Sequence, residues 1–107
     1  MKINKFDVVN ELKTDRDIDG FVSAFIKEAE ETGSVEQIPY ALGIAARAKG
    51  MLKTANEVGV NREQLYKSLS KTGNPSFKTI FKVAKSLGYK ISFEAMKKQK
   101  KSSFFNT

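Results

Sequence analysis

The 107-residue chain has no cysteine, no histidine and no tryptophan, and only two prolines. The absence of cysteine excludes disulfides, thiolate metal sites and a cysteine nucleophile. The absence of histidine removes the usual zinc ligand and the usual general base near neutral pH. An enzyme is therefore disfavoured, and we expect no catalytic residues, no metal site, no cofactor and no small-molecule substrate.

Long apolar segments are also missing. No run of about 18 apolar residues occurs, so the sequence predicts no membrane-spanning helix. The first residues, MKINKFDVVNELK, lack the apolar region of a secretory signal peptide. We therefore expect a cytoplasmic protein, without contact with a membrane.

The charge is divided unevenly between the two parts of the chain. Residues 1–48 carry six Lys or Arg against nine Asp or Glu, a net charge of −3. Residues 49–107 carry thirteen Lys or Arg against three Glu, a net charge of +10. A field of one sign attracts polyanions, of which nucleic acid is the commonest in a cell. This distribution favours a nucleic-acid-binding protein associated with the nucleoid.

Hydrophobic periodicity predicts five helices, followed by a short strand. The expected helices cover about 14–33, 34–50, 52–58, 62–70 and 77–87. Glycines mark several of the helix ends, with Gly33 ending the first helix, which Thr14 or Asp15 can cap. Ser34, Asn61 and Ser76 are the expected N-caps of the second, fourth and fifth helices. We divide the chain into an N-terminal arm at 1–13, a helical domain at 14–96 and a basic flexible tail at 97–107.

The expected strand lies at Tyr89–Glu94, where apolar and polar residues alternate. A single strand leaves backbone N–H and C=O groups without partners. Either the N-terminal segment pairs with it, or the same strand of a second copy does. The second arrangement predicts a homodimer in which Tyr89, Ile91 and Phe93 contribute to the interface.

Two of the predicted helices, 52–58 and 62–70, are short and joined by a tight turn at Gly59-Val60. This pattern is typical of a helix-turn-helix, whose second helix enters the major groove of DNA. With Leu65 and Leu69 facing the core, the opposite face of the second helix is polar. The residues expected to meet the DNA from this helix and its ends are Asn61, Arg62, Glu63, Gln64, Lys67, Ser70 and Lys71.

The stretch Gly73-Asn74-Pro75-Ser76 precedes the last predicted helix. Amide groups at a helix N-terminus attract anions, so we expect Asn74 and Ser76 to contact a backbone phosphate. Lys49, Lys53 and Lys78, together with Lys71, are predicted to make further phosphate contacts that do not depend on the base sequence.

The densest motif is Arg62-Glu63-x-Leu65-Tyr66-Lys67-x-Leu69, followed by Gly73-Asn74-Pro75-Ser76-Phe77. With this motif the chain resembles the addiction-module antidote proteins over most of its length. These are small prophage-type proteins with a Cro/lambda-repressor-like fold, related in architecture to the HigA antitoxins. The resemblance implies a mainly α fold: a five-helix lambda-repressor-like helix-turn-helix domain with an added N-terminal helix and a short C-terminal strand. It also implies a dimeric repressor that binds a double-stranded DNA operator of its own operon and neutralises a small cognate toxin.

Two other functions fit the residues. One is a stand-alone prophage repressor of the Cro type that has no toxin. The other is a protein-interaction module in which the acidic first half binds a basic partner and DNA affinity is incidental. The acidic residues that this last hypothesis needs are Asp15, Asp17, Asp19, Glu28, Glu30 and Glu31.

Overall fold

The computed structural model describes residues 5–97 and is mainly helical. Within this range six helices follow one another, with no strand between them. Their bounds are α1 Lys5–Glu11, α2 Asp15–Thr32, α3 Gln37–Lys49, α4 Met51–Val58, α5 Arg62–Ser68 and α6 Phe77–Ser86. Among the described residues, no helix is both long and apolar enough to cross a membrane.

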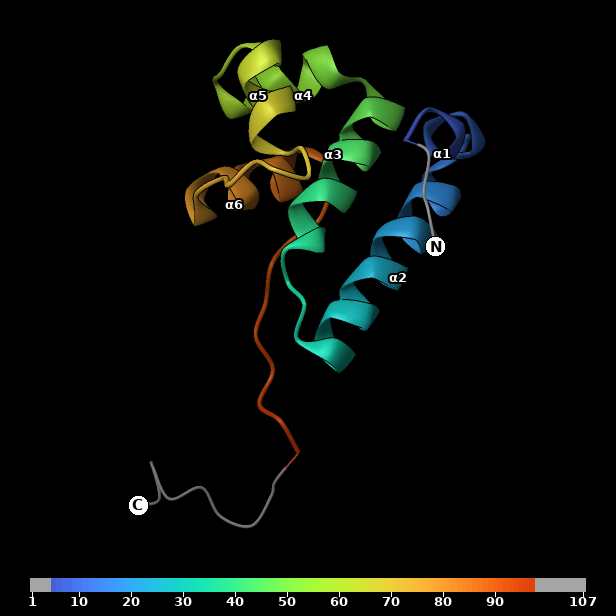
Figure 1. The fold of residues 1–107 in the computed structure, drawn as a ribbon, viewed down its shortest axis with the longest axis vertical. Helices are drawn as coiled ribbons and strands as arrows, with labels where there is room; N and C mark the ends of the chain where they lie inside the picture. The colour runs from blue at the N-terminus through green and yellow to red at the C-terminus, as the bar shows by residue number, and fades with distance from the viewer. Residues whose placement is uncertain (1–4, 98–107) are drawn as a thin grey trace.

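The helices form two groups (Figure 1). The long helices α2 and α3 lie side by side, and α1 packs against α3 near the start of α2. The three short helices α4, α5 and α6 gather at the C-terminal end of α3. After α6 the chain leaves this group and runs toward the opposite end of the molecule, where α2 ends.

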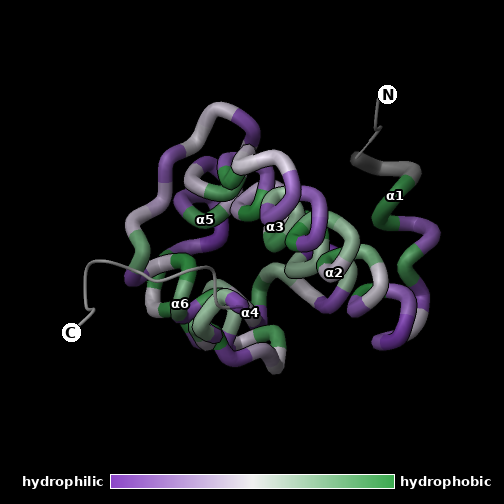
Figure 2. The backbone as a smooth tube through the Cα atoms, turned by 90° about the horizontal axis from the view of Figure 1, so that it is seen from below, coloured by the Kyte–Doolittle hydropathy of each residue, from purple (hydrophilic) through white to green (hydrophobic). Residues whose placement is uncertain are grey.

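The core lies where these two groups meet. Apolar side chains at helical spacing turn inward from every helix from α2 to α6, so that apolar and polar stretches alternate along the tube in Figure 2. The buried cluster consists of Ile18, Val22, Leu42, Ala45, Ala46, Met51, Ala55, Val58, Leu65, Leu69, Val83 and Leu87. This core holds α5 and α6 in fixed positions on the body.

Most predicted helix ends are confirmed. Thr14 caps α2 in a reciprocal capping box with Asp17, and Gly33 ends the helix with a φ of 81°. Asn61 and Ser76 are the N-caps of α5 and α6, as predicted. Helix α5 is shorter than expected, because Leu69 already forms its C-cap.

The prediction that Ser34 caps α3 is wrong. The helix begins at Gln37 after Glu36, which makes no side-chain cap. The backbone N–H of Ser34 instead donates a hydrogen bond to Thr32 Oγ1 at 3.1 Å. Ser34 could cap only a helix that begins at residue 35. Residues 35 and 36 form a turn, and α3 begins two residues later, at Gln37.

The strand predicted at 89–94 is also absent from the described chain. Residues 90–97 have no regular secondary structure. The physical reason is the lack of a partner: the N-terminal segment, which was one candidate for pairing, forms helix α1 instead.

Tyr89, one of the residues expected in the dimer interface, has an intramolecular partner. Its hydroxyl donates a hydrogen bond to Asp19 Oδ1 at 2.6 Å, which ties the end of α6 to α2. Partial burial of the ring, followed by the hydrogen bond to Asp19, raises the pKa of the Tyr89 phenol above its ordinary value of 10.0.

A pH dependence follows from this raised pKa. Above about pH 10 the unfolded chain loses the Tyr89 proton while the folded chain keeps it, so the free energy of unfolding falls as the pH rises. We expect Tyr89→Phe to reduce this alkaline loss, measured as the difference between urea unfolding at pH 8 and at pH 10.5. Tyr40→Phe is the matched control. An equal loss in wild type and Tyr89→Phe would contradict the prediction.

Candidate nucleic-acid interface

Helices α4 and α5 are joined by a tight turn at Gly59. Gly59 has a φ of 89°, in the left-handed region that favours glycine. Its backbone N–H and that of Val60 both donate hydrogen bonds to the Ala55 carbonyl, at 2.9 and 3.1 Å. These bonds close the C-terminus of α4 and set the direction in which the chain enters α5.

Helix α5 is anchored on the core by two leucines. Leu65 and Leu69 are 1% and 3% exposed. Gly43 of α3 permits the close approach of this end of α5, because a Cβ at Gly43 would lie 3.0 Å from Leu69 Cβ. The helix is therefore fixed by its inner face, and its outer face is left in solvent.

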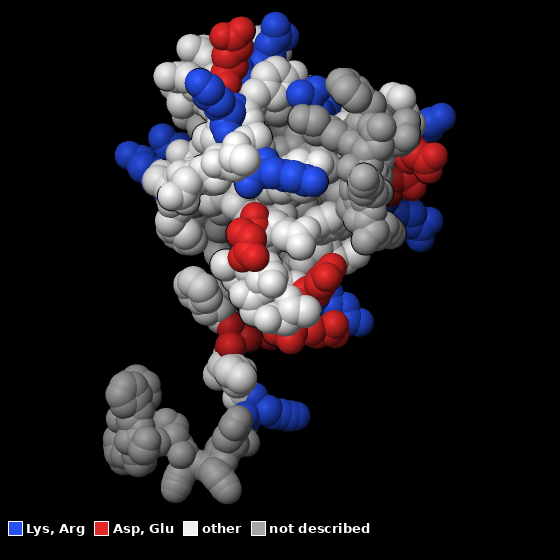
Figure 3. Space-filling view, viewed as in Figure 1, with Lys and Arg blue, Asp and Glu red and all other residues white. Residues whose placement is uncertain are grey.

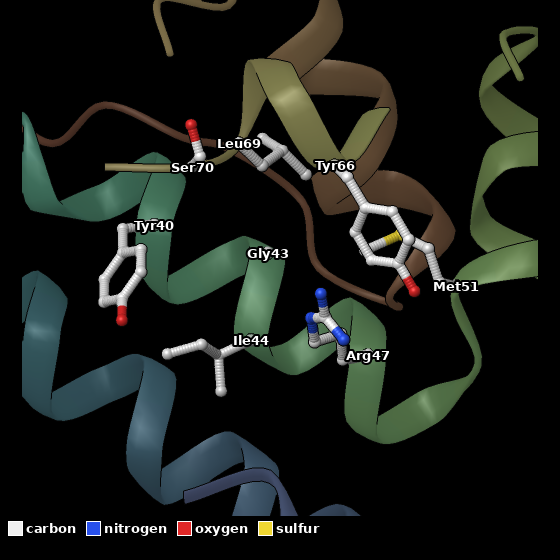
Figure 4. A pocket seen from close by; sticks show the side chains of 8 residues that line it. All are labelled: Tyr40, Gly43, Ile44, Arg47, Met51, Tyr66, Leu69 and Ser70. Atoms are coloured by element: carbon white, nitrogen blue, oxygen red, sulfur yellow. The ribbon is translucent and has the colours of Figure 1, made fainter. Parts of the chain in front are cut away.

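Tyr66 adds a contact between α5 and α3 that the sequence did not reveal. The guanidinium carbon of Arg47 lies 4.3 Å from the centre of the Tyr66 ring, a cation–π distance. Figure 4 shows these two side chains facing each other beside Met51. The surrounding pocket has a volume of about 20 Å³, room for about one water molecule. In the sequence, the one sign of this contact is the spacing of Tyr40, Gly43 and Arg47. They lie three and four residues apart, which places them on the same face of α3.

The N-terminus of α5 is closed by a reciprocal capping box. Asn61 Oδ1 accepts a hydrogen bond from the backbone N–H of Gln64 at 2.8 Å. Gln64 Oε1 accepts one from the backbone N–H of Asn61 at 3.4 Å, a long and weak bond. Arg62 and Glu63 are exposed between these two residues. The amide of Gln64 therefore keeps its donor group and most of its acceptor capacity for a ligand.

A shallow groove runs along the outer face of α5 and the loop that follows it. It is lined by Gln64, Lys67, Ser68, Ser70, Thr72, Gly73 and Asn74. The hydroxyl of Ser70 donates a hydrogen bond to the Lys67 carbonyl at 2.9 Å, which folds the loop back on the helix end. Four predicted site residues, Gln64, Lys67, Ser70 and Asn74, thus meet in one groove.

Lys71, Ser76 and Lys78, which were also predicted to contact DNA, do not line this groove. The Lys71 ammonium stands 5.3 Å from the centre of the Tyr40 ring. Ser76 Oγ accepts a hydrogen bond from the Thr79 backbone N–H at 3.1 Å and so caps α6. Lys78, in the first turn of α6, is exposed.

Lys49 and Lys53 lie in a different place. Lys49 Nζ donates a hydrogen bond to the Leu87 carbonyl at 3.0 Å and is 3.8 Å from Asp15 Oδ1. Lys53 Nζ is 3.3 Å from Glu57 Oε2. Both lysines line a second groove, between the start of α2 and the end of α6, and not the groove along α5.

Glu57 completes this second cluster. It accepts a hydrogen bond from Ser86 Oγ at 2.5 Å, which joins α4 to α6. That hydrogen bond, followed by the contact with Lys53, holds the pKa of the Glu57 carboxyl below its usual value. The described residues contain no group of three acidic, histidine or cysteine side chains placed to hold a metal ion.

Comparison with known proteins identifies the family. Residues 2–95 match the family model described as "probable addiction module antidote protein". An uncharacterized protein of Haemophilus influenzae is 37% identical over 93 residues, which cover 87% of this chain and 92% of the relative. No solved structure gives a significant match. The chain therefore belongs to the addiction module antidote family, and such an antidote implies a cognate toxin as partner.

Proposed function

We propose that the protein is a sequence-specific DNA-binding regulator and the antitoxin of a toxin–antitoxin operon that it represses itself. In this proposal α4, the turn at Gly59 and α5 are the helix-turn-helix of a lambda-repressor-like domain, and α5 enters the major groove. The observation that carries the proposal is the position of α5. Its inner face is fixed by Leu65 and Leu69, whereas its polar outer face is exposed.

The exposed residues divide into two kinds of contact. The proposed readers of base edges are Asn61, Arg62, Glu63, Gln64 and Lys67. Their side chains include the types that pair with bases: Gln and Asn with adenine, Arg and Lys with guanine, and Glu with cytosine. Ser70 and Asn74 within the groove, and Lys71, Ser76 and Lys78 outside it, are the proposed phosphate contacts.

Lys49 and Lys53 are less suited than the other lysines to contact phosphates. Because each ammonium already has a partner in the free protein, a phosphate contact would first have to break it. Of the two, Lys53 has the more exposed side chain, 71% against 28%. We therefore keep Lys53 as an outer phosphate contact and assign Lys49 to the packing of α3 on α6.

The arrangement of charge supports DNA binding at the α4–α6 end. Residues 51–86, which span these three helices, carry seven Lys or Arg against two Glu, a net charge of +5. In Figure 3 basic side chains surround the upper part of the molecule together with a few acidic ones, whereas acidic side chains are most numerous toward the lower end, where some basic ones also lie. A duplex approaching the α5 face would meet the positive end first, which favours fast and salt-sensitive association.

Repressors of this kind bind as dimers to operators with two half-sites about 34 Å apart. We propose a homodimer here as well. Within the described chain the backbone of residues 90–97 has no secondary-structure partner, and Ile91 and Phe93 remain available for an interface between two copies. Tyr89 is bonded within its own chain and would contribute only the exposed part of its ring.

Substitutions at Gln64 test the proposed reader. We expect Gln64→Ala to weaken binding to the DNA upstream of the protein's own gene by about 1–3 kcal/mol, because a bidentate base contact is lost. The measurement is the ratio of affinities for this fragment and for a scrambled fragment of equal composition. Lys78→Ala, by contrast, should weaken binding to both fragments alike.

Gln64→Glu is the matched control for helix integrity. Glutamate keeps the oxygen that accepts the Asn61 N–H but loses the amide donor needed for adenine. If Gln64→Ala acted only by fraying α5, Gln64→Glu would preserve the affinity ratio. Unchanged ratios in both variants would show that α5 does not read the sequence.

A further inference from the structure

Arg47, near the C-terminal end of α3, carries a positive charge that no carboxylate balances. Its guanidinium carbon lies 4.3 Å from the centre of the Tyr66 ring of α5. With residues 8–97 it makes no ion pair and forms no hydrogen bond. Every buried side-chain nitrogen or oxygen in the described chain has a hydrogen-bond partner, so the unpaired N–H groups of half-buried Arg47 reach solvent. The guanidinium is thus held in place with its donors unused.

The ring of Tyr66 fixes this charge without satisfying its donors. An aromatic ring attracts a cation placed over its face, but the face has no oxygen that could accept an N–H. The donors of a guanidinium lie in one plane and match two oxygens of a phosphate or carboxylate. The adjoining pocket, of about 20 Å³, has room for one such oxygen but not for a small-molecule ligand. The oxygens therefore have to come from a group on the surface of a larger molecule.

The charges around Arg47 favour an anion as the ligand. Helix α3 has no carboxylate, and Glu63 is the only one in α5 or in the loop at 69–76. Glu63 is exposed one turn before Tyr66 and makes no ion pair with Arg47. The other cations of these three segments are Lys49, Arg62, Lys67 and Lys71, of which Lys49 is bonded to the Leu87 carbonyl. The surroundings of Arg47 therefore carry more positive than negative charge.

Arg47 also lies beside the proposed DNA groove. Tyr66 comes one turn after Arg62, so these two residues share one flank of α5. Ser70, just past the end of the helix, lines both the pocket at Arg47 and the groove along α5. Figure 4 shows Ser70, Tyr66 and Arg47 around the same pocket. A duplex whose major groove holds α5 has phosphates along both flanks of this helix, and those on the α3 side would come near Arg47.

We infer that Arg47 binds a backbone phosphate of the DNA and that Tyr66 holds its guanidinium ready for this contact. This inference rests on the proposed DNA-binding function and adds to it a contact from α3, outside the proposed helix-turn-helix. Arg47 touches α5 through Tyr66 and would touch DNA through its N–H groups. It would therefore join the body of the protein, the proposed reader helix and the phosphate backbone at one point.

The test measures how the affinity of the full chain for DNA depends on salt, between about 50 and 200 mM. The two DNA molecules are the fragment upstream of the protein's own gene and a scrambled fragment of equal composition. Arg47→Met removes the charge but keeps a long side chain that can pack on Tyr66. We expect this variant to bind both fragments more weakly by the same factor. The slope of log affinity against log salt concentration should become shallower by about 0.9, which is about 3.5-fold over this range.

Two further variants serve as controls. Arg16→Met makes the same charge change in exposed α2, which lies on the other side of α3 from α5 in Figures 1 and 2, so the slope should not change. Arg47→Lys keeps the charge and should keep most of the slope, but it should bind more weakly because an ammonium lacks the bidentate fork. Urea unfolding shows whether each variant is folded. If Arg47→Met is not, Arg47→Gln takes its place.

The outcomes separate the inference from the function on which it rests. If the wild-type chain binds neither fragment, the DNA-binding function fails and the inference with it. If the wild type binds and the charge-removing variant of Arg47 keeps the wild-type slope, the residue only packs on Tyr66, and the inference alone is wrong. An equal change of slope in Arg16→Met would assign the effect to overall charge and would also overturn it. A lost preference for the protein's own fragment at an unchanged slope would make Arg47 a positioning residue for α5 and not a phosphate contact.

Discussion

Gly73→Ala is expected to lower the free energy of unfolding by about 3 kcal/mol, toward the upper part of the range for overpacking in a tightly packed site. A Cβ at this position would collide with the carbonyl oxygens of Lys67 and Ser68. These are backbone atoms at the end of α5, so they cannot move aside as the tip of a flexible side chain can. For a domain of this size the loss corresponds to a fall in melting temperature of about 12 °C or more.

The requirement at Gly73 is one of space and not of backbone conformation. Its φ is not among the positive values found at four other glycines, and its N–H donates a hydrogen bond to the Ser70 carbonyl at 3.0 Å. The loop packs directly on the C-terminal turn of α5, and this packing forms one wall of the proposed DNA groove. Gly73→Ala should therefore weaken DNA binding as well as stability.

Gly20→Ala is the matched control for this prediction. Gly20 lies in the exposed part of α2, with nothing within 4 Å of an added Cβ. Alanine is the better helix former, so this variant should gain about 0.5–1 kcal/mol. Thermal and urea unfolding of the two variants give the comparison. Equal stabilities for Gly20→Ala and Gly73→Ala would mean that the loop does not pack on α5 as described.

Leu65→Ala is the second substitution with a large expected effect, a loss of about 2–5 kcal/mol. Leu65 is 1% exposed and is one of the largest fully buried side chains in the described chain. Its removal leaves a cavity between α5 and the core that the surrounding helices can fill only in part. Because small domains are stabilised by only about 5–15 kcal/mol, the loss is a large share of the total.

The matched control is Leu52→Ala. Leu52 is on neighbouring α4 but is 59% exposed, so its truncation should change stability by no more than about 0.5 kcal/mol. Urea unfolding curves measure both variants. A second measurement is the DNA binding of Leu65→Ala at a temperature where this variant is still folded. We expect its preference for the specific DNA sequence to be lost, because Leu65 no longer fixes α5 on the core. Similar unfolding midpoints for Leu65→Ala and Leu52→Ala would contradict the conclusion that Leu65 anchors α5 on the core.

The molecule separates two kinds of surface by using two groups of helices. The α4–α6 group presents the polar face of α5 and the basic residues beside it, whereas the far end of α2 presents carboxylates and exposed apolar side chains. The rigid body between them is the core shared by α2 to α6.

Local signals in the sequence were sufficient for five of the six helices in the described residues and for most of their caps, although the cap predicted at Ser34 was wrong. Asn61 and Ser76 are the side chains that cap a helix best, and each acts through residues within three positions of itself. The inward direction of Leu65 and Leu69 also follows from helical spacing, because one helix must bury one face. The family resemblance, read from the motif at 62–77, agrees with the match over residues 2–95.

Contacts between distant segments had no such local signal. The strand expected at 89–94 is missing because pairing needs a partner, and no pattern within six residues can supply one. Lys49 was grouped with the phosphate contacts on charge alone, yet its ammonium binds a carbonyl 38 residues away. The pairing of Arg47 with Tyr66 depends on the angle at which α5 crosses α3.

The sequence by itself therefore determined the helical class, most helix ends, the division of charge and the polar face of α5, because these depend on residues close together along the chain. The tertiary structure alone decided which of the cationic side chains lie beside the α5 groove. It also decided that Gly73 is needed for close packing and that Phe93 and Met96 stay exposed beside Glu30. These features depend on how the helices pack in space, and that packing is set by the whole core.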